Sequence, residues 1–164
     1  MLLEGSCHCQ AVRFRVLCPH PYPFNVCYCG ICRKTGGAGG SAINIGAEAA
    51  SLEILQGADQ LRSYHARMEG DDGTVSQSNA ERRFCGTCGC HLWLFDSRWP
   101  DLIHPLASAI DTPLPVPPEH THLMTDFRPD WVMFRPDPTD RQHGRYPDES
   151  IADWHARLGL ADSD

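Results

Sequence analysis

The chain has 164 residues, 41% hydrophobic and 21% charged, which is enough apolar material for one domain with a buried core. Its formal net charge of -7 disfavours general binding to DNA or RNA, because phosphates repel an acidic surface. The sequence has neither a run of roughly 20 apolar residues typical of a membrane span nor the basic and apolar start of a secretory signal. We therefore expect a cytoplasmic protein that binds neither nucleic acids nor membranes.

Short segments with strand character follow one another along the chain. Val12, Phe14 and Val16 alternate with arginines, which predicts a half-buried strand. Further strands are predicted at residues 41–45, 52–55, 62–66, 91–95 and 131–134. The polar residues 66–80 are typical of a loop, and the prolines of residues 111–120 exclude regular structure. The predicted fold class is mainly β.

One helix is predicted, near the end of the chain, over residues 148–160. Its signals are a capping residue, an apolar face and a terminal glycine, supplied by Asp148, by Ile151, Trp154 and Leu158, and by Gly159. We expect this helix to pack against the rest of the fold without a chemical role. The organisation is then a single domain over residues 1–164, with its core at about 5–135 and a C-terminal extension that carries the helix.

Nine cysteines are the main chemical signal. A reducing compartment disfavours a disulfide framework, and the odd count argues the same way, so metal binding is the leading interpretation. Seven of the nine lie in three motifs, which are Cys7-His8-Cys9, Cys27-Tyr28-Cys29-Gly30-Ile31-Cys32 and Cys85-Gly86-Thr87-Cys88.

The spacing of each motif suits a shared ion. In a C-x-C motif on a strand, both side chains point to the same face of the sheet. In a C-x-x-C motif a tight turn brings both sulfur atoms to one ion, and Gly86 and Gly89 ease such a turn. Zinc–sulfur bonds of about 2.3 Å in a tetrahedron place the sulfur atoms roughly 3.8 Å apart.

Counting ligands separates two sites. A structural zinc has four protein ligands, and Cys7, Cys9, Cys85 and Cys88 make such a set. The remaining motif offers only three ligands, which is the pattern of a reactive zinc with one open position. We expect that site to hold zinc more weakly, with partial occupancy, and to accept a substrate sulfur as its fourth ligand.

Other residues leave alternatives open. The second site could instead be closed by a nearby thiol or imidazole, from Cys18, Cys90, His8, His20 or His91. Cations flank the motifs at Arg33, Lys34, Arg82 and Arg83. They could offset the negative charge of zinc thiolates or hold the carboxylates of an anionic ligand.

Four segments in order resemble the glutathione-dependent formaldehyde-activating enzyme family, also called Gfa-like, whose domain occurs in centromere protein V. They are "GSCHCQAVRFRV", "CYCGICRKTGG", "RRFCGTCGCHLW" and "LASAIDTP…PPEHTHLMTDFRPDW", from about Gly5 to Trp131. The resemblance implies a β-tent of small zinc-bound sheets. It also implies a structural zinc at Cys7, Cys9, Cys85 and Cys88, and a catalytic zinc at Cys27, Cys29 and Cys32.

The family chemistry joins glutathione to formaldehyde, giving S-hydroxymethylglutathione, and is classed with the carbon–sulfur lyases. The chain departs from the family at three positions, with Gln10 in place of Gly, Tyr28 in place of His and Cys90 in place of Ser. None of these removes a ligand. We therefore expect a zinc-dependent carbon–sulfur lyase acting on a small thiol, such as glutathione, and an aldehyde. The alternatives are a non-enzymatic zinc module that binds a thiol or protein partner, and a thiol redox sensor. The sequence identifies no general base.

Overall fold

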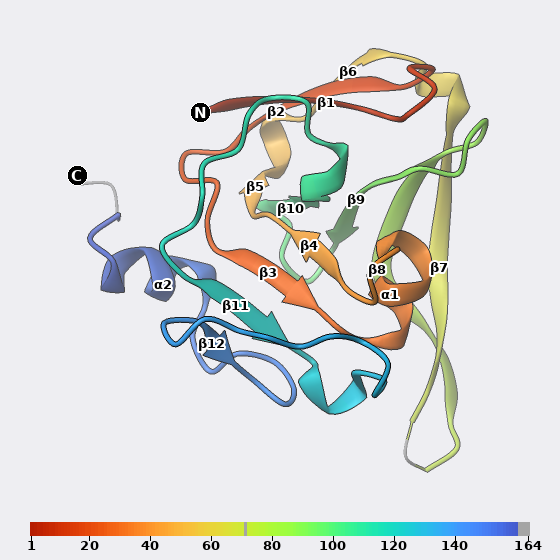
Figure 1. Cartoon of the computed structure of the whole chain (residues 1–164). Coiled ribbons are helices and arrows are strands. Elements are labelled where there is room, and N and C mark those ends of the chain that lie inside the picture. Colours follow the sequence, from red (N-terminus) through yellow and green to blue (C-terminus); the bar gives the residue numbers. More distant parts are fainter. Residues whose placement is uncertain (71, 161–164) are drawn as a thin grey trace. The chain divides into compact units, whose positions relative to one another are not determined.

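The computed structural model describes residues 1–70 and 72–160 (Figure 1). In these residues the backbone forms twelve strands in three sheets, with two α-helices and four short 3-10 helices. The predicted mainly β class is confirmed. The chain divides into two compact units, the first made of Met1–Pro19 and Ala47–Pro113 and the second of His20–Gly46 and Leu114–Asp164. The single domain over residues 1–164 stays a prediction.

The first unit contains a three-stranded antiparallel sheet. Its order is β1 (Leu2–Ser6), β2 (Arg13–Leu17) and β6 (Glu53–Gln56). β2 and β6 lie where the sequence predicts strands. On β2, Phe14 and Val16 are fully buried, while Arg13 is exposed and Arg15 half-buried, as the alternation of the sequence indicates.

The first unit also contains a five-stranded antiparallel sheet. Its order is β5 (Ala47–Glu48), β10 (Leu102–Pro105), β9 (His91–Asp96), β8 (Val75–Cys85) and β7 (Leu61–Glu69). The packing of Phe14 against Trp93, with ring centroids 4.9 Å apart, contributes to the core of this unit. Short 3-10 helices cover Ala49–Ser51, Ala58–Gln60 and Ala107–Ala109.

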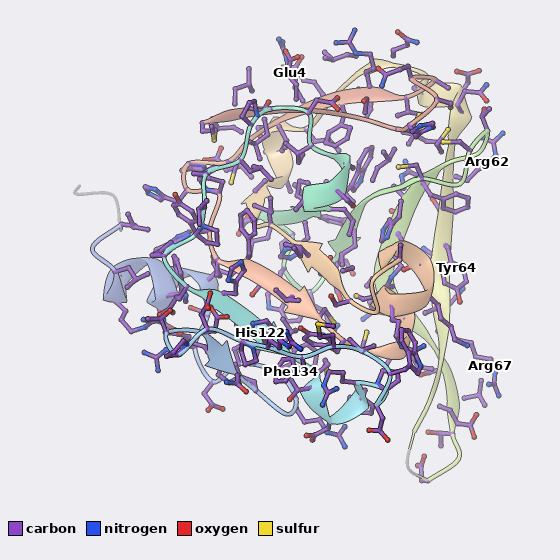
Figure 2. All side chains as sticks on the ribbon, in the orientation of Figure 1. Glu4, Arg62, Tyr64, Arg67, His122 and Phe134 are labelled. Carbon is purple, nitrogen blue, oxygen red and sulfur yellow. The ribbon has the colours of Figure 1, made fainter. Side chains whose placement is uncertain are left out.

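The prediction of a loop at residues 66–80 is wrong, because β7 and β8 extend through most of this segment as a hairpin. Both strands are largely exposed there, so neither face carries the apolar alternation that marks a strand in a sequence. Figure 2 shows Arg62, Tyr64 and Arg67 along β7, the edge strand of the sheet. Polar side chains on an edge strand are a common defence against unwanted strand pairing.

The second unit contains a four-stranded sheet in the order β12 (Arg141–Gln142), β11 (His120–Leu123), β3 (Phe24–Cys27) and β4 (Ala42–Asn44). β11 runs parallel to both β3 and β12, whereas β4 is antiparallel to β3. Residues 111–119 form no helix or strand, as the prolines indicate, and β11 begins at His120. A 3-10 helix at Thr125–Phe127 follows β11.

Two α-helices belong to the second unit. The C-terminal helix α2 (Ile151–Arg157) lies within the predicted segment, and its Trp154 is 1% exposed. Its cap is Ser150 and not Asp148: the Ser150 hydroxyl accepts from Asp153 N, and the Asp153 carboxylate accepts from Ser150 N. This reciprocal pair satisfies two backbone donors, whereas a lone capping aspartate satisfies one.

The sequence does not predict the other helix, α1 (Gly30–Gly36). Seven residues are too few to show a helical period, and α1 has a glycine at each end. The helix begins because Cys29 acts as its cap, its Sγ accepting from Cys32 N at 3.3 Å. α1 therefore presents the second half of a cysteine motif.

The strand predicted at residues 131–134 is wrong. The segment forms a turn, in which Val132 N donates to Pro129 O at 3.0 Å. Its side chains still alternate, with Val132 buried and Trp131 and Met133 exposed. Among the described strands, however, none pairs with this segment through a ladder of hydrogen bonds. Val132 instead packs into a core cluster with Val26 and Tyr28.

Candidate metal centres

Four cysteines of the first unit come together. The Sγ atoms of Cys7, Cys9, Cys85 and Cys88 all lie within 4.8 Å of one another. Cys9 Sγ is 3.5 Å from Cys7 Sγ and 3.8 Å from Cys85 Sγ. These separations agree with the roughly 3.8 Å between sulfur atoms that share a tetrahedral zinc.

The C-x-C half of this group lies in a turn after β1 and not on a strand. Gln10 adopts a φ of 63° and its N donates to Cys7 O at 2.9 Å, which reverses the chain. Val12 N donates to Cys7 Sγ at 3.2 Å. The turn therefore brings the two sulfur atoms close and supplies a backbone hydrogen bond that stabilises a thiolate.

The C-x-x-C half follows the last residue of β8. Gly89 N donates to Cys85 O at 2.8 Å, and Gly89 has a φ of 73°, which favours glycine in this tight turn. Backbone N–H groups of Cys9 and Cys90 lower the pKa of the Cys88 thiol to about 6. Cys7 and Cys85 are fully buried, whereas Cys9 and Cys88 are exposed.

The donor chemistry of this group fits a soft divalent ion. Four sulfur atoms at tetrahedral separation, with backbone donors directed at them, are the usual surroundings of a structural zinc. The structure brings the four thiols together, and their metal stays a prediction.

Three cysteines of the second unit form the other group. The Sγ atoms of Cys27, Cys29 and Cys32 lie within 4.8 Å of one another. Cys27 ends β3, and the other two stand at the start of α1. Cys27 and Cys32 are 6% and 5% exposed, while Cys29 is half-buried. The strand end and the first turn of α1 thus converge on one small volume.

Hydrogen bonds from the Cys27 and Cys32 thiols lower the pKa of the Cys29 thiol to about 2. The same contact with Cys29 raises the pKa of Cys27. These hydrogen bonds favour the thiolate form of Cys29, which is the most accessible cysteine of the three. A divalent cation among them would release the remaining protons, because metal binding requires thiolates.

The residues considered as a fourth ligand do not join either group in the part of the chain that the structure describes. Cys18 is fully buried, and burial raises the pKa of its thiol to about 12. Burial also raises the pKa of Cys90, whose Sγ lies 3.8 Å from His91 O. His91 contacts Trp93 O, and burial lowers the pKa of its ring to about 4.

The two remaining candidates also lie outside both groups. His8 is exposed, and the ring of His20 packs edge-on against His155, with centroids 5.2 Å apart.

A polar network next to the second group was not predicted from the sequence. The Tyr28 side chain, between two of the cysteines in sequence, contacts His122 Nδ1 through its hydroxyl at 3.0 Å. His122 Nε2 lies 3.1 Å from Asp140 Oδ2. Because the carboxylate only accepts, the contact with Asp140 requires a proton on His122 Nε2. Figure 2 shows His122 beside Phe134, whose ring packs edge-on against it with centroids 5.3 Å apart.

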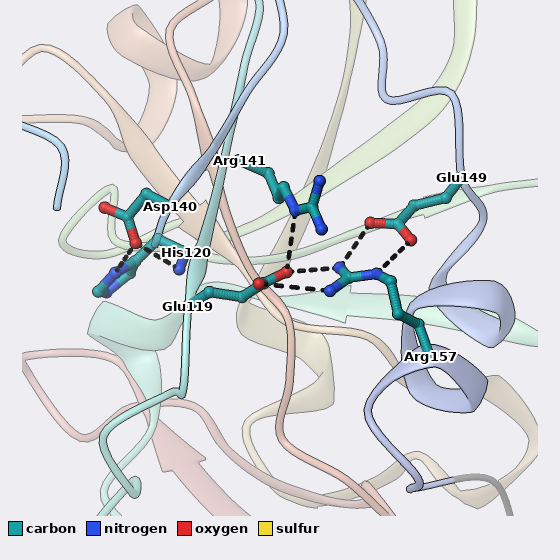
Figure 3. A network of polar contacts seen from close by, with 6 residues as sticks. All are labelled: Glu119, His120, Asp140, Arg141, Glu149 and Arg157. Atoms are coloured by element: carbon teal, nitrogen blue, oxygen red, sulfur yellow. Dashed lines mark hydrogen bonds and ion pairs between the residues drawn. The ribbon is translucent and has the colours of Figure 1, made fainter. Parts of the chain in front are cut away.

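The only signal of this network in the sequence is the spacing of His120 and His122, which places both rings on one face of a strand. Asp140 Oδ1 accepts from His120 N at 2.7 Å and lies 3.2 Å from His120 Nδ1 (Figure 3).

A second ionic network involves α2. Arg157 lies between Glu119 and Glu149, and Arg141 Nε lies 3.8 Å from the same Glu119 carboxylate (Figure 3). The two carboxylates raise the pKa of Arg157 further. These contacts tie α2 to the segment before β11.

Two of the four cations near the motifs have partners of their own. Arg82 is buried and its Nη1 lies 3.5 Å from Ala80 O. Arg83 forms an ion pair with Glu81 at 3.1 Å. Arg33 and Lys34 follow Cys32 in α1, and Arg33 Cζ lies 6.0 Å from the centre of the Trp131 ring.

The first unit also contains a cavity of about 210 Å³ whose lining includes Leu52, Ile54, Trp93 and Phe95. No cysteine is among the described residues that line it. Among the described residues, no helix has the length and apolar character needed to cross a membrane.

Comparison with known proteins identifies the family of the chain. The family model described as "Glutathione-dependent formaldehyde-activating enzyme" matches residues 2–126. A protein of Halomonas elongata named "Putative glutathione-dependent formaldehyde-activating enzyme" is 58% identical over 160 residues, which cover 98% of each chain. A crystal structure of a Rhodobacter sphaeroides protein superimposes with a TM-score of 0.51 and 26% identity, over 68% of this chain and 91% of that one. The chain therefore belongs to the glutathione-dependent formaldehyde-activating enzyme family.

Proposed function

We propose that this protein is a zinc-dependent enzyme of the carbon–sulfur lyase type, which joins glutathione or a similar small thiol to formaldehyde or a related aldehyde. The observation that carries this proposal is the three-cysteine group, which offers one ligand fewer than a closed structural site. The names of the family model and of the similar protein support glutathione as the thiol and formaldehyde as the aldehyde.

Cys27, Cys29 and Cys32 would hold the zinc. The bound metal would lower the pKa of a substrate thiol, so that its sulfur is held as thiolate at neutral pH. The half-buried Cys29 is the most accessible of the three ligands, and the substrate would therefore approach from its side. The backbone N–H of Cys32 stabilises negative charge on Cys29 Sγ through the hydrogen bond at the start of α1.

The reaction balances without a further reagent. The thiol sulfur forms a bond to the carbonyl carbon of the aldehyde, the π bond of the carbonyl breaks, and the thiol proton ends on the new hydroxyl. The reverse reaction cleaves the same carbon–sulfur bond. The Tyr28–His122–Asp140 network would position Tyr28, and with it the backbone between Cys27 and Cys29, for this chemistry.

The four-cysteine group would hold a structural zinc. It joins the turn after β1 to the turn after β8, two segments separated by 76 positions at Cys9 and Cys85. Closing so long a loop removes conformational freedom from the unfolded chain, so metal binding there contributes to folding.

The first test counts metal. Native protein is treated with a mild chelator, with and without glutathione, and zinc per chain is measured by mass spectrometry. We expect one zinc to leave easily and to be retained by glutathione, because a thiol fills the open position and stabilises the occupied site. Cys29→Ser should abolish this retention, and Cys85→Ser should instead leave the chain poorly folded.

The second test follows turnover. Formation of the hydroxymethyl thioether is monitored by NMR against the uncatalysed addition, with native protein and Cys29→Ser compared at equal concentration. Equal resistance of both zincs to chelation, with four protein ligands each by X-ray absorption, would reject the reactive site. Reversible zinc release on mild oxidation without any turnover would instead identify a redox sensor.

A further inference from the structure

Arg33 carries an unsatisfied buried donor next to the second cysteine group. Its Nε is buried without a hydrogen-bond partner, a feature that it shares with Arg82 and Arg128. Arg82 and Arg128 each have another guanidinium nitrogen within hydrogen-bond distance of a backbone carbonyl. Among the described residues, the Arg33 guanidinium has no hydrogen-bond partner of this kind. It instead faces the aromatic ring of Trp131.

The guanidinium of Arg33 lies at the C-x-x-C turn itself. A Cβ on Gly30 would be 3.9 Å from Arg33 Nη2 and would meet no other atom within 4 Å. Gly30 stands between Cys29 and Cys32 in sequence, and Arg33 N donates to Cys29 O at 3.0 Å. The cationic group and open space therefore lie together beside the candidate ligands.

Trp131 lies behind this cation. Its ring centre is 6.0 Å from Arg33 Cζ, and the residue is 68% exposed. The adjacent Val132 is 4% exposed and packs close to Gly40, where a Cβ would come within 2.4 Å of Val132 Cγ2. Packing of Val132 thus holds an accessible indole ring next to the guanidinium, where it can attract the cation through its π face.

Most arginine side chains prefer an acidic partner, because a guanidinium presents parallel donors that match the two oxygens of a carboxylate. The chain has such pairs, including Arg15 with Glu53 and Arg98 with Asp96. Arg33 has no carboxylate partner among the described residues, although acidic side chains outnumber basic ones in the sequence, 21 to 14. The exposed Lys34 beside it adds a second positive charge.

We propose that Arg33, backed by Trp131, binds a carboxylate of the thiol substrate. The protein then selects carboxylate-bearing thiols over neutral ones of the same size. This inference rests on the proposed function, since it takes the substrate sulfur to bind at Cys27, Cys29 and Cys32. The carboxylate would satisfy donors that the folded chain leaves unpaired.

The ligand side of the test needs no variant. Calorimetry on the zinc-loaded native protein compares 3-mercaptopropionate with 2-mercaptoethanol, and glutathione with its diethyl ester. The acid of each pair should bind about 10- to 100-fold more tightly, the range expected for a hydrogen bond to a charged group. Equal affinities within each pair would overturn the inference.

The protein side of the test separates Arg33 from its neighbour. Arg33→Gln should remove most of the preference for the acids. It should leave the affinity for 2-mercaptoethanol within about 2-fold, because this neutral ligand has no carboxylate to pair with the guanidinium. Arg33→Lys should keep part of the preference, since lysine retains the charge but not the paired donors. Lys34→Gln removes one positive charge at the neighbouring position, and this variant should keep nearly all of the preference for the acids.

The two hypotheses fail in different measurements. The proposed function, and this inference with it, is rejected if the native protein binds no thiol or binds thiols no better than the Cys29→Ser variant. The inference alone is rejected if thiol binding depends on Cys29 but the Arg33→Gln variant still prefers the carboxylate-bearing thiols. Zinc content and circular dichroism of each variant confirm that the comparison is made between folded proteins.

Discussion

Asp140 offers a quantitative test of the network beside the second cysteine group. Its side chain is 4% exposed, and its oxygens accept from His120 N at 2.7 Å and from Asp137 N at 2.9 Å. Burial by itself raises the pKa of this carboxyl. The two backbone donors and the rings of His122 and His120 outweigh that effect and lower the pKa from 3.8 to about 2.

The sign and size of the effect follow from this difference. A carboxyl whose pKa is lower in the folded state stabilises the fold above its unfolded pKa of 3.8, and this stability is lost as the pH falls through about 2. Each tenfold change in proton affinity is worth about 1.4 kcal/mol, so the ionised Asp140 contributes about 2 kcal/mol at neutral pH.

The perturbation is Asp140→Asn, which removes the charge and keeps the size. Urea unfolding of native and variant protein is measured at intervals from pH 7 to pH 2. The difference in free energy of unfolding should be at least about 2 kcal/mol at pH 7 and should shrink by about that amount below pH 3.8. If a bound metal is released at acid pH, it is released from both proteins, so the difference remains interpretable.

Asp130→Asn is the matched control, because Asp130 is an exposed carboxylate of the same unit. Its substitution should change the free energy of unfolding by less than about 0.5 kcal/mol at every pH. A difference for Asp140→Asn that stays constant from pH 7 to pH 2 would refute the reasoning, because the cost would then come from lost shape or lost acceptors and not from the charge.

Two further predictions concern packing in the second unit. Trp154→Ala should lower the free energy of unfolding by roughly 3–5 kcal/mol in a urea titration, because Trp154 is 1% exposed and is the buried residue of α2. A loss below about 1 kcal/mol would mean that α2 does not pack on the core. Gly40→Ala should destabilise by about 2 kcal/mol or more, since Gly40 has a φ of 92° and a Cβ there would overlap a buried valine. Gly39→Ala, with no atom within 4 Å of the new Cβ, should leave the melting temperature nearly unchanged.

The sequence by itself determined the mainly β class and the grouping of cysteines by ligand count. The alternation around Phe14 indicates β2, because one face of that strand is buried and the other is solvated. The cysteine motifs are readable because metal ligands must be close together, so short spacings carry geometric information. The two-zinc assignment of these groups stays a prediction, and the four and three thiols lie together in the structure.

The alternation of apolar residues within a segment was insufficient to predict strands where burial and hydrogen-bond partners depend on distant parts of the chain. The hairpin of β7 and β8 has two exposed faces at its outer end, so its strands leave no apolar alternation in the sequence. Residues 131–134 have the alternation but form no strand, because no strand within residues 1–70 and 72–160 pairs with them. Hydrogen-bond partners decide strand formation, and a single segment does not show them.

Only the tertiary structure placed Tyr28 against His122, which is 94 positions away in the sequence. It also placed the exposed Trp131 beside Arg33, at the turn between two cysteines. Both contacts arise because the chain returns through β11 and the segment after it to the side of β3 and α1. Such contacts depend on which distant segments share a sheet, which is a property of the whole packed core and not of any local stretch of sequence.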